Sequence, residues 1–287
     1  MSALVADVVA VRVPERTWRS EARAVKTVWR RDMIRFLGNR AQTMTWLIQP
    51  LLFLFVLGSG LQSLSAASTD GVDLKTFIFP GVVCIAVLFT AMISAASLVW
   101  DRELGFLREM MVAPVSRTSI IVGKCLGAAT IAASQGAIVL ALAGFVDVPY
   151  DPVLLLGALG LLVLLAFTVT AFGVLVAVTI KQAQTFTWVM QMVVFPMLFL
   201  SGALYPVAGL PAWLEVLNRI NPLTYAVDPM RHLVFSHLDV SEAARRTLDP
   251  GVTWFGWRVP SLVEVGVVVL LGLAMMGVAI WRFSRTD

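Results

Sequence analysis

The sequence predicts an all-α membrane protein with six transmembrane helices, and three observations support this fold class. Of the 287 residues, 59% are hydrophobic and only 14% are charged, whereas soluble domains usually carry about 25% charged residues. The hydrophobic residues gather in runs of about 20, the length of a helix that crosses a hydrocarbon core. These runs do not alternate between apolar and polar residues, which favours helices over a β-barrel.

Six runs are candidate spans, and they are almost free of charge. The first five contain no charged residue, and the sixth contains only Glu264, close to its start. The six predicted spans are Met44–Leu64, Phe77–Trp100, Cys125–Val146, Val153–Ile180, Thr185–Tyr205 and Leu262–Trp281. Buried charges in spans mark proton or ion pathways, so an ion-coupled carrier is disfavoured.

Lysine and arginine residues are distributed unevenly between the two sides of these spans. Sixteen lie before the first span, in the second and fourth connections or after the last span, and six lie on the other side. Basic residues favour the cytoplasmic side of a bacterial plasma membrane. We therefore expect a multi-pass protein with both termini in the cytoplasm. The pI near 9.4 reflects this topology and does not indicate a nucleic-acid partner.

The chain divides into an N-terminal segment, residues 1–43, and a six-span domain, residues 44–287. Within the first segment, Thr17–Arg40 has the spacing of an amphipathic helix. Its apolar face is predicted to contain Trp18, Ala22, Val25, Trp29, Met33 and Phe36, with arginines over much of the remainder. Tryptophans beside a basic face favour a helix at the membrane surface, in contact with lipids. A simple positive anchor is the alternative.

The connection between the fifth and sixth spans is the longest on the outer side. At about residues 209–237 it predicts short helices, because Pro211 and Pro222 suit first helical positions and Asn221 suits an N-cap. These helices are too short to span, so we expect them at membrane level. The following stretch, Asp239–Pro260, is polar and is expected to be exposed, with Trp254 and Trp257 suited to the interface.

Catalytic and cofactor motifs are missing from the sequence. Gly123-Lys124 is followed by Cys125 and lacks the upstream glycine of a phosphate-binding loop, so the chain has no Walker A motif. The two histidines and two cysteines form no metal-ligand pattern, and Cys84 and Cys125 are expected to be core residues. We predict no catalytic residue, no metal site and no cofactor in this chain.

The spans do contain neutral polar residues. The candidate pathway residues are Gln49, Ser94, Gln135, Thr170 and Gln191. Hydrogen bonding between helices is the alternative role for each. Gly123 and Gly127 have a spacing that permits close helix approach.

Charges of both signs crowd into "LVWDRELGFLREMMVAPVSR", Leu98–Arg117, between two apolar runs. On a single helix from Asp101 to Ala113, one arc is apolar, with Glu103 intruding on it. Methionines adapt well to binding surfaces. The pattern favours a cytoplasmic helix that docks into a groove on a soluble partner, and packing against its own spans is the alternative.

The longer stretch Leu98–Gly127, "LVWDRELGFLREMMVAPVSRTSIIVGKCLG", resembles the connection between spans two and three of type 2 ABC-transporter permeases, particularly those for daunorubicin resistance and nodulation-factor export. Two further stretches resemble the same family: "FPGVV" at Phe79–Val83, and Phe195–Arg231. The resemblance implies a coupling helix at about 101–113 that includes Asp101, Arg102, Glu103, Gly105, Leu107, Met110 and Met111. It also implies an outer gate region shaped by Pro206, Pro211, Asn221, Pro222, Tyr225 and Arg231.

The function that the resemblance implies is ATP-driven export of an amphipathic metabolite, drug or lipid-linked compound. The chain would be the permease subunit without enzymatic activity, and ATP and Mg would bind to a separate cytosolic ATPase present in two copies. A second permease subunit, identical or related, would complete the pathway. The alternative is a membrane scaffold that recruits a cytosolic enzyme through the same helix without transport.

Overall fold

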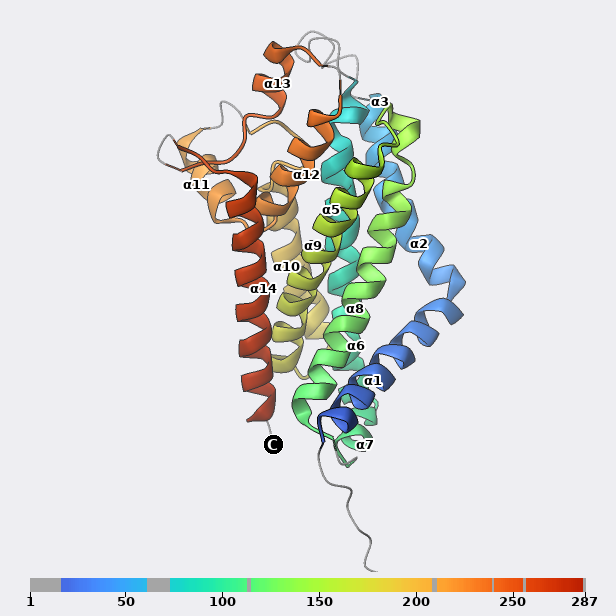
Figure 1. Cartoon of the computed structure of the whole chain (residues 1–287). Coiled ribbons are helices and arrows are strands. Elements are labelled where there is room, and N and C mark those ends of the chain that lie inside the picture. Colours follow the sequence, from blue (N-terminus) through green and yellow to red (C-terminus); the bar gives the residue numbers. More distant parts are fainter. Residues whose placement is uncertain are drawn as a thin grey trace, which may run out of the picture.

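The computed structural model describes residues 17–60, 73–112, 115–207, 211–238, 240–254 and 257–285; within these ranges, the side chains of residues 40–43, 108, 111, 112, 243 and 246 are not described. The described chain is almost entirely helical, which confirms the all-α class. Its long helices run side by side in one bundle (Figure 1).

A helix, α1 (Trp18–Gly38), covers most of the predicted N-terminal segment Thr17–Arg40. It begins with a capping box, in which Thr17 and Ser20 exchange hydrogen bonds between side chain and backbone. The helix crosses the bundle obliquely and continues after Asn39 into α2 (Arg40–Leu51) (Figure 1). Pro50 interrupts the hydrogen-bond ladder of α2, and a π-helical stretch, Leu52–Leu57, and the short α3 (Gly58–Gly60) follow.

Among the described residues, four helices are long and apolar enough to cross a membrane. They are the continuous helical stretch Leu74–Glu103, formed by α5 (Leu74–Ala95) and α6 (Ser97–Glu103), together with α8 (Arg117–Leu140), α9 (Pro152–Thr179) and α14 (Ser261–Ser284). They correspond to the second, third, fourth and sixth predicted spans. Asp151 caps α9 by accepting hydrogen bonds from the backbone N–H groups of Val153 and Leu154.

The other two predicted spans correspond to shorter apolar helices, Met44–Gly60 and α10 (Ala183–Phe199). With 17 residues, α10 is about 25 Å long, less than a hydrocarbon core of about 30 Å. It ends before the predicted Tyr205 because the chain turns at Gly202, whose φ of 70° favours glycine. Residues 61–64 of the first predicted span lie outside the described residues.

The third span was placed too late in the chain. We predicted Cys125–Val146, but α8 begins at Arg117 and ends at Leu140, followed by a 3₁₀ turn, Ala143–Val146. Lys124 therefore lies inside this helix, and it is almost fully buried. The expectation that the third span is free of charge is wrong.

The connection before α14 carries α11 (Ala212–Ile220), α12 (Thr224–Ser236), α13 (Glu242–Leu248) and an antiparallel pair of strands, β1 (Thr253–Trp254) and β2 (Trp257–Arg258). The short helices at about 209–237 are thus present, with residues 209 and 210 outside the described part. The stretch Asp239–Pro260 is less exposed than predicted. Ala244, Leu248, Val252 and Val259 are buried in it.

The centre of the bundle is α5, whose residues are nearly all buried. It packs against α8 and α9, while α14 packs on α9 and α1 packs on α8. Helix α12 lies across one end, in contact with α5, α9 and α14. Cys84 and Cys125 are buried free thiols, as predicted for core residues.

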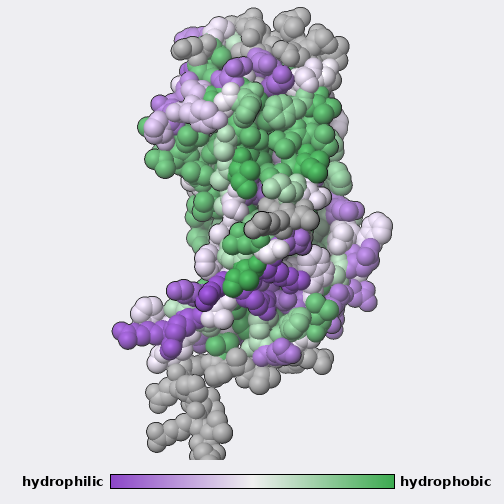
Figure 2. All heavy atoms as spheres, turned by 90° about the vertical axis from the view of Figure 1, so that its right-hand side faces the viewer, coloured by the Kyte–Doolittle hydropathy of each residue, from purple (hydrophilic) through white to green (hydrophobic). Residues whose placement is uncertain are grey.

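Described elements that were predicted to share a side lie at the same end of the bundle. The start of α1, α6 with α7 (Phe106–Val112), and the final turn of α14 lie at one end of the bundle, which we call the basic end (Figure 1). The elements α11 to α13 lie at the opposite end. Seen from the side of α1, a hydrophobic band separates two regions rich in hydrophilic side chains (Figure 2).

Candidate functional site

A cavity of about 440 Å³ lies between α2, α5 and α10. Most of its wall is apolar and includes Phe89, Met92, Trp100, Phe186 and Phe195. Three neutral polar side chains also line it: Gln49 from α2, and Thr187 and Gln191 from α10. Apolar cavities with a few polar groups are the usual form of small-molecule sites. The cavity suits an amphipathic ligand.

The structure brings together only two of the five candidate pathway residues. Gln49 and Gln191 share this cavity, whereas Ser94, Gln135 and Thr170 are buried elsewhere. The Ser94 and Thr170 hydroxyls and both polar atoms of the Gln135 amide have no hydrogen-bond partner within the described residues. Hydrogen bonding between helices uses Thr168 instead, whose hydroxyl donates to the Val268 carbonyl at 3.0 Å.

Helix α10 is attached to the bundle through a narrow stripe of side chains. Phe186, Met190, Val194 and Leu198 recur every four residues and are buried. Other large side chains of the same helix are exposed, among them Trp188, Met192, Phe195 and Phe199. A second cavity of about 220 Å³ lies on the other side of α10, toward α9 and α14. Helix α10 thus has a cavity on each side of its packing stripe.

The coupling segment was predicted as a single helix from Asp101 to Ala113, and this is wrong. Helix α6 ends at Glu103, and α7 begins at Phe106. The break lies at Gly105, whose φ of 82° is outside the helical range and favours glycine. Ala113 lies outside the described residues. Because the two helices do not share an axis, the apolar arc drawn on one wheel does not exist as a continuous face.

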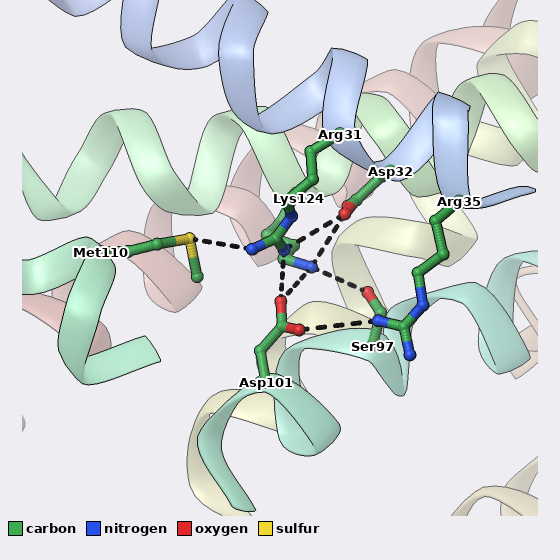
Figure 3. A network of polar contacts seen from close by, with 7 residues as sticks. All are labelled: Arg31, Asp32, Arg35, Ser97, Asp101, Met110 and Lys124. Atoms are coloured by element: carbon green, nitrogen blue, oxygen red, sulfur yellow. Dashed lines mark hydrogen bonds and ion pairs between the residues drawn. The ribbon is translucent and has the colours of Figure 1, made fainter. Parts of the chain in front are cut away.

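Asp101 belongs to a network of charges between α1, α6 and α8 (Figure 3). Its carboxylate lies 2.5 Å from Lys124 Nζ and 2.5 Å from an Arg31 nitrogen, with Arg35 at 3.7 Å. Asp32 lies 3.1 Å from Lys124 Nζ and 3.3 Å from Arg31. Burial opposes the charged form of Arg31, but Asp101 and Asp32 outweigh this effect and raise the pKa of its guanidinium.

The next two residues contact the connection between α9 and α10. The Arg102 guanidinium donates to the carbonyls of Ala177 at 3.3 Å, Val178 at 3.2 Å and Ile180 at 2.7 Å. Glu103 Oε1 accepts a hydrogen bond from the Ala183 N–H at 2.8 Å. Both side chains therefore have partners in their own chain.

The remaining residues of the coupling segment differ in exposure. Leu107 is buried, and the Met110 sulfur accepts a hydrogen bond from Arg31 at 3.4 Å. Leu104 and Phe106, on either side of Gly105, are 64% and 48% exposed. The Met111 side chain lies outside the described ones. The apolar surface open to a partner at this end therefore includes the Gly105 turn.

Helix α1 uses the close-approach glycines of α8. A Cβ added at Gly123 would lie 2.8 Å from Val28 Cβ, and one at Gly127 would lie 3.2 Å from Asp32. Glu21 accepts hydrogen bonds from the Ser116 N–H and hydroxyl and from the Ser119 hydroxyl at the start of α8. The face of α1 toward the bundle thus contains charged residues as well as Val28, whereas Trp18 of the predicted apolar face is 78% exposed.

At the opposite end lies Arg231, the largest fully buried side chain in the described part of the chain. Its guanidinium donates to the Gly202 carbonyl at 2.6 Å and lies 4.5 Å from the centre of the Phe77 ring. This cation–π contact and hydrogen bond fasten α12 to the turn after α10 and to α5. Arg231 therefore stabilises the end of the bundle opposite the basic end.

The proline and asparagine positions differ slightly from those predicted. Pro211 caps α11 and is not its first helical residue, and α12 begins at Thr224, two residues after Pro222. Asn221 ends α11; its side chain donates to the Met197 carbonyl at 2.7 Å and accepts from the Leu223 N–H at 3.0 Å. Pro206 is described in the turn between α10 and α11.

Two buried residues at the opposite end, Tyr225 and Asp249, have polar partners. The Tyr225 hydroxyl donates to the Arg219 carbonyl at 2.6 Å and accepts from the Trp254 indole at 3.0 Å. Asp249 lies 2.8 Å from His232 and 3.6 Å from Arg258. Burial raises the pKa of the Asp249 carboxyl, although His232 and Arg258 favour its charged form.

Sequence reasoning missed Asp32, Lys124 and Asp249 as structurally important charges. Asp32 lies beside many arginines and resembles an ordinary surface residue in sequence. One feature of the sequence could have indicated partners for Lys124. It lies between Gly123 and Gly127, whose spacing permits close approach of another helix. Asp249 carried no comparable pattern.

The sequence predicts no metal site in this chain. Among the described residues, no group of three or more histidine, cysteine, aspartate or glutamate side chains could hold a metal ion.

Comparison with known proteins agrees with the fold. The ABC-2 type transporter family matches residues 23–235. The chain is 30% identical over 194 residues to the putative transport permease ycf38 of Cyanophora paradoxa, covering 67% of each protein. It is 29% identical to nodulation protein J of Rhizobium leguminosarum bv. trifolii, covering 73% of this chain and 80% of that one.

A third relative is the probable multidrug ABC transporter permease YbhR of Escherichia coli K12, at 30% identity over 54% of this chain and 43% of that protein. The region that matches the family, residues 23–235, includes most of α1, all of α6, α7 and α10, and nearly all of α12. A family match over most of the chain, an all-helical apolar bundle and relatives named as permeases lead to one conclusion. This chain is a multi-pass membrane protein of the ABC-2 type transporter family, a transport permease subunit whose family implies an ABC ATPase partner.

Proposed function

We propose that the chain is the membrane subunit of an ATP-driven exporter, and that the cavity between α2, α5 and α10 receives an amphipathic substrate. The observation that carries this proposal is the composition of the cavity wall. Gln49, Thr187 and Gln191 supply hydrogen-bonding groups, and Phe89, Trp100 and Phe195 supply apolar surface. A ligand with a polar group on an apolar body is complementary to such a wall.

The energy for transport comes from a separate ATPase. The sequence has no phosphate-binding loop, so ATP and Mg bind to the partner. We place the basic end of the bundle in the cytoplasm of a bacterial cell, because α1, the 180–182 connection and the end of α14 bring their lysines and arginines to it. The exposed Leu104 and Phe106 beside Gly105 then face the ATPase.

Two permease subunits and two ATPase copies form the working complex. Trp188, Met192, Phe195 and Phe199 leave one side of α10 apolar and exposed, beside a cavity that the single chain does not close. A second permease, identical or related, covers this side and completes the pathway. Lipid covers the apolar surface that remains.

The test is reconstitution of the chain with its ATPase in liposomes. A panel of amphipathic compounds is screened for stimulation of ATP hydrolysis and for export. With a compound that stimulates, Gln191→Leu is expected to change the apparent affinity about tenfold, the usual effect of one hydrogen bond to a ligand. Gln184→Leu is the matched control, because Gln184 lies on the same helix but does not line the cavity.

The outcome that would overturn the proposal is a complex that hydrolyses ATP but moves none of the compounds and shows no stimulation. Stable recruitment of the ATPase or of another cytosolic enzyme with no transport would favour the scaffold function instead. Equal effects of Gln191→Leu and Gln184→Leu on a real export activity would move the substrate site away from this cavity.

A further inference from the structure

Two helix ends meet the same pair of side chains at the basic end. Helix α9 ends at Thr179 and α10 begins at Ala183, three residues later. Arg102 contacts the last carbonyls of α9, and Glu103 contacts the first N–H group of α10. These adjacent residues form the last turn of α6, which belongs to the coupling segment.

The charges match the polarity of the two ends. The last carbonyls of a helix lack internal partners and attract cations, and the first N–H groups lack partners and attract anions. Three Arg102 contacts lie between 2.7 and 3.3 Å, and the Glu103 contact is 2.8 Å. A cation at the end of α9 and an anion at the start of α10 are each favourable.

The two helices do not supply these groups themselves. No basic residue lies in the last turn of α9, and the Gln182 side chain, at the N-cap position of α10, makes no capping hydrogen bond. The caps therefore come from α6, about 80 residues earlier in the chain. Helix α6 is thus in direct contact with the start of α10.

Helix α10 is well placed to respond. Its buried side chains form a single stripe from Phe186 to Leu198, flanked by partly buried Val189 and Met197, with cavities on both sides. At the opposite end, Asn218 donates to the Leu200 carbonyl at 2.8 Å and Asn221 to the Met197 carbonyl at 2.7 Å. The helix is thus held at both ends by hydrogen bonds and loosely along its length.

We propose that Arg102 and Glu103 are positioning residues that connect the coupling segment to α10, so that movement of α6 changes the wall of the cavity containing Gln191. This inference rests on the proposed export function. It assigns Glu103 to a contact within the chain, where a role in the ATPase groove was the expectation from sequence. If Glu103 contacts the ATPase, its loss should weaken ATPase recruitment. If it holds the start of α10, its loss should leave recruitment intact and reduce export per ATP.

The first experiment measures distance and needs no substrate. Spin labels are attached at Leu104→Cys and Gln184→Cys, two exposed positions beside the contact, in the full chain in liposomes without the ATPase, because Leu104 faces the ATPase in the proposed complex. Without Glu103→Ala, the distance distribution should be narrow. With Glu103→Ala it should broaden, and Glu103→Gln should restore the narrow distribution because its amide oxygen still accepts the Ala183 hydrogen bond.

The second experiment measures coupling at matched expression. Glu103→Ala should leave ATPase co-purification and basal hydrolysis within about twofold, while export per ATP falls about tenfold, as expected for one charge-assisted hydrogen bond. Glu103→Gln should recover most of the export. Gln182→Ala, in the same connection, should behave like the unchanged chain. The same measurements on Arg102→Ala and Arg102→Lys test the contact at the end of α9.

Each outcome separates this inference from the proposed function. Loss of ATPase co-purification in both Glu103→Ala and Glu103→Gln would place Glu103 in the docking surface and overturn the inference. An unchanged distance distribution in Glu103→Ala would also overturn it. If the unchanged complex exports nothing but Glu103→Ala broadens the distribution, the proposed function fails and the contact between α6 and α10 stands. If Glu103→Ala does not insert, Glu103→Gln and Glu103→Lys provide the same comparison.

Discussion

Lys124 Nζ lies 2.5 Å from the carboxylate of Asp101 and 3.1 Å from that of Asp32, in a site where the lysine side chain is only 1% exposed. The three residues come from α8, α6 and α1. This network joins α1 and α6 to the same point of α8.

Lys124→Met should destabilise the protein strongly. It removes the buried cation shared by two carboxylates, and breaking a buried ion pair from one side usually costs about 3–5 kcal/mol. Thermal unfolding of the purified chain in detergent measures the loss. Arg35→Ala is the control: its side chain is 56% exposed and 3.7 Å from Asp101, and surface pairs contribute about 0–1 kcal/mol. Equal shifts for the two variants would contradict this assignment.

Gly127→Leu should detach α1 from α8. A Cβ at Gly127 would already lie 3.2 Å from Asp32, and a larger side chain has no room there. The measurement is the reaction rate of Val28→Cys, a nearly buried position, with a thiol reagent. Gly160→Leu is the matched control, because a Cβ at Gly160 meets nothing within 4 Å. If Val28→Cys reacts at the same rate in both backgrounds, the glycines do not seat α1.

Asp249 should make stability depend on pH in a predictable direction. Burial raises the pKa of its carboxyl in the folded state above the ordinary 3.8. The folded state therefore binds this proton more tightly than the unfolded state. The resulting stability is present below pH 3.8 and is lost as pH rises through the raised folded value. Melting temperatures of the unchanged chain and of Asp249→Asn, compared over this range, measure the effect.

The difference between these two melting temperatures isolates Asp249 from the other titrating groups. The unchanged chain should lose stability relative to Asp249→Asn as pH rises. A difference that stays constant, or that changes in the opposite direction, would show that His232 and Arg258 compensate fully for burial.

Lipid should shield Leu217 from water, whereas the surrounding helices should shield Val227. Leu217 is 39% exposed on α11 beside the exposed Trp213 and Ile220, whereas Val227 on α12 is buried in the bundle. Spin labels at Leu217→Cys in liposomes should collide with oxygen, which dissolves in lipid, and little with a water-soluble nickel chelate. Labels at Val227→Cys should collide with neither. Strong collisions of the chelate with Leu217→Cys would place α11 in water.

The sequence alone predicted the all-α membrane class, which the structure confirms, and the grouping of the basic connections at one end of the bundle. These properties depend on local composition. A run of about 20 apolar residues must form a helix in a membrane because its backbone polar groups need internal partners. Basic residues near span ends determine the predicted orientation for the same local reason. The short helices begin within two residues of Pro211 and Pro222, where the sequence predicted their starts, because proline acts on its immediate neighbours.

Tertiary structure alone decided which charges are buried, and therefore how the coupling segment is connected. Hydropathy excluded Lys124 from the third span because a charge is costly in an apolar helix. It cannot report that Asp32, 92 residues earlier, lies 3.1 Å away and offsets this cost. Glu103 and Ala183 are 80 residues apart. Their contact depends on how α6 ends beside α10, and Gly105 then turns the chain into α7. Such pairs arise from packing between distant helices, which no local pattern encodes.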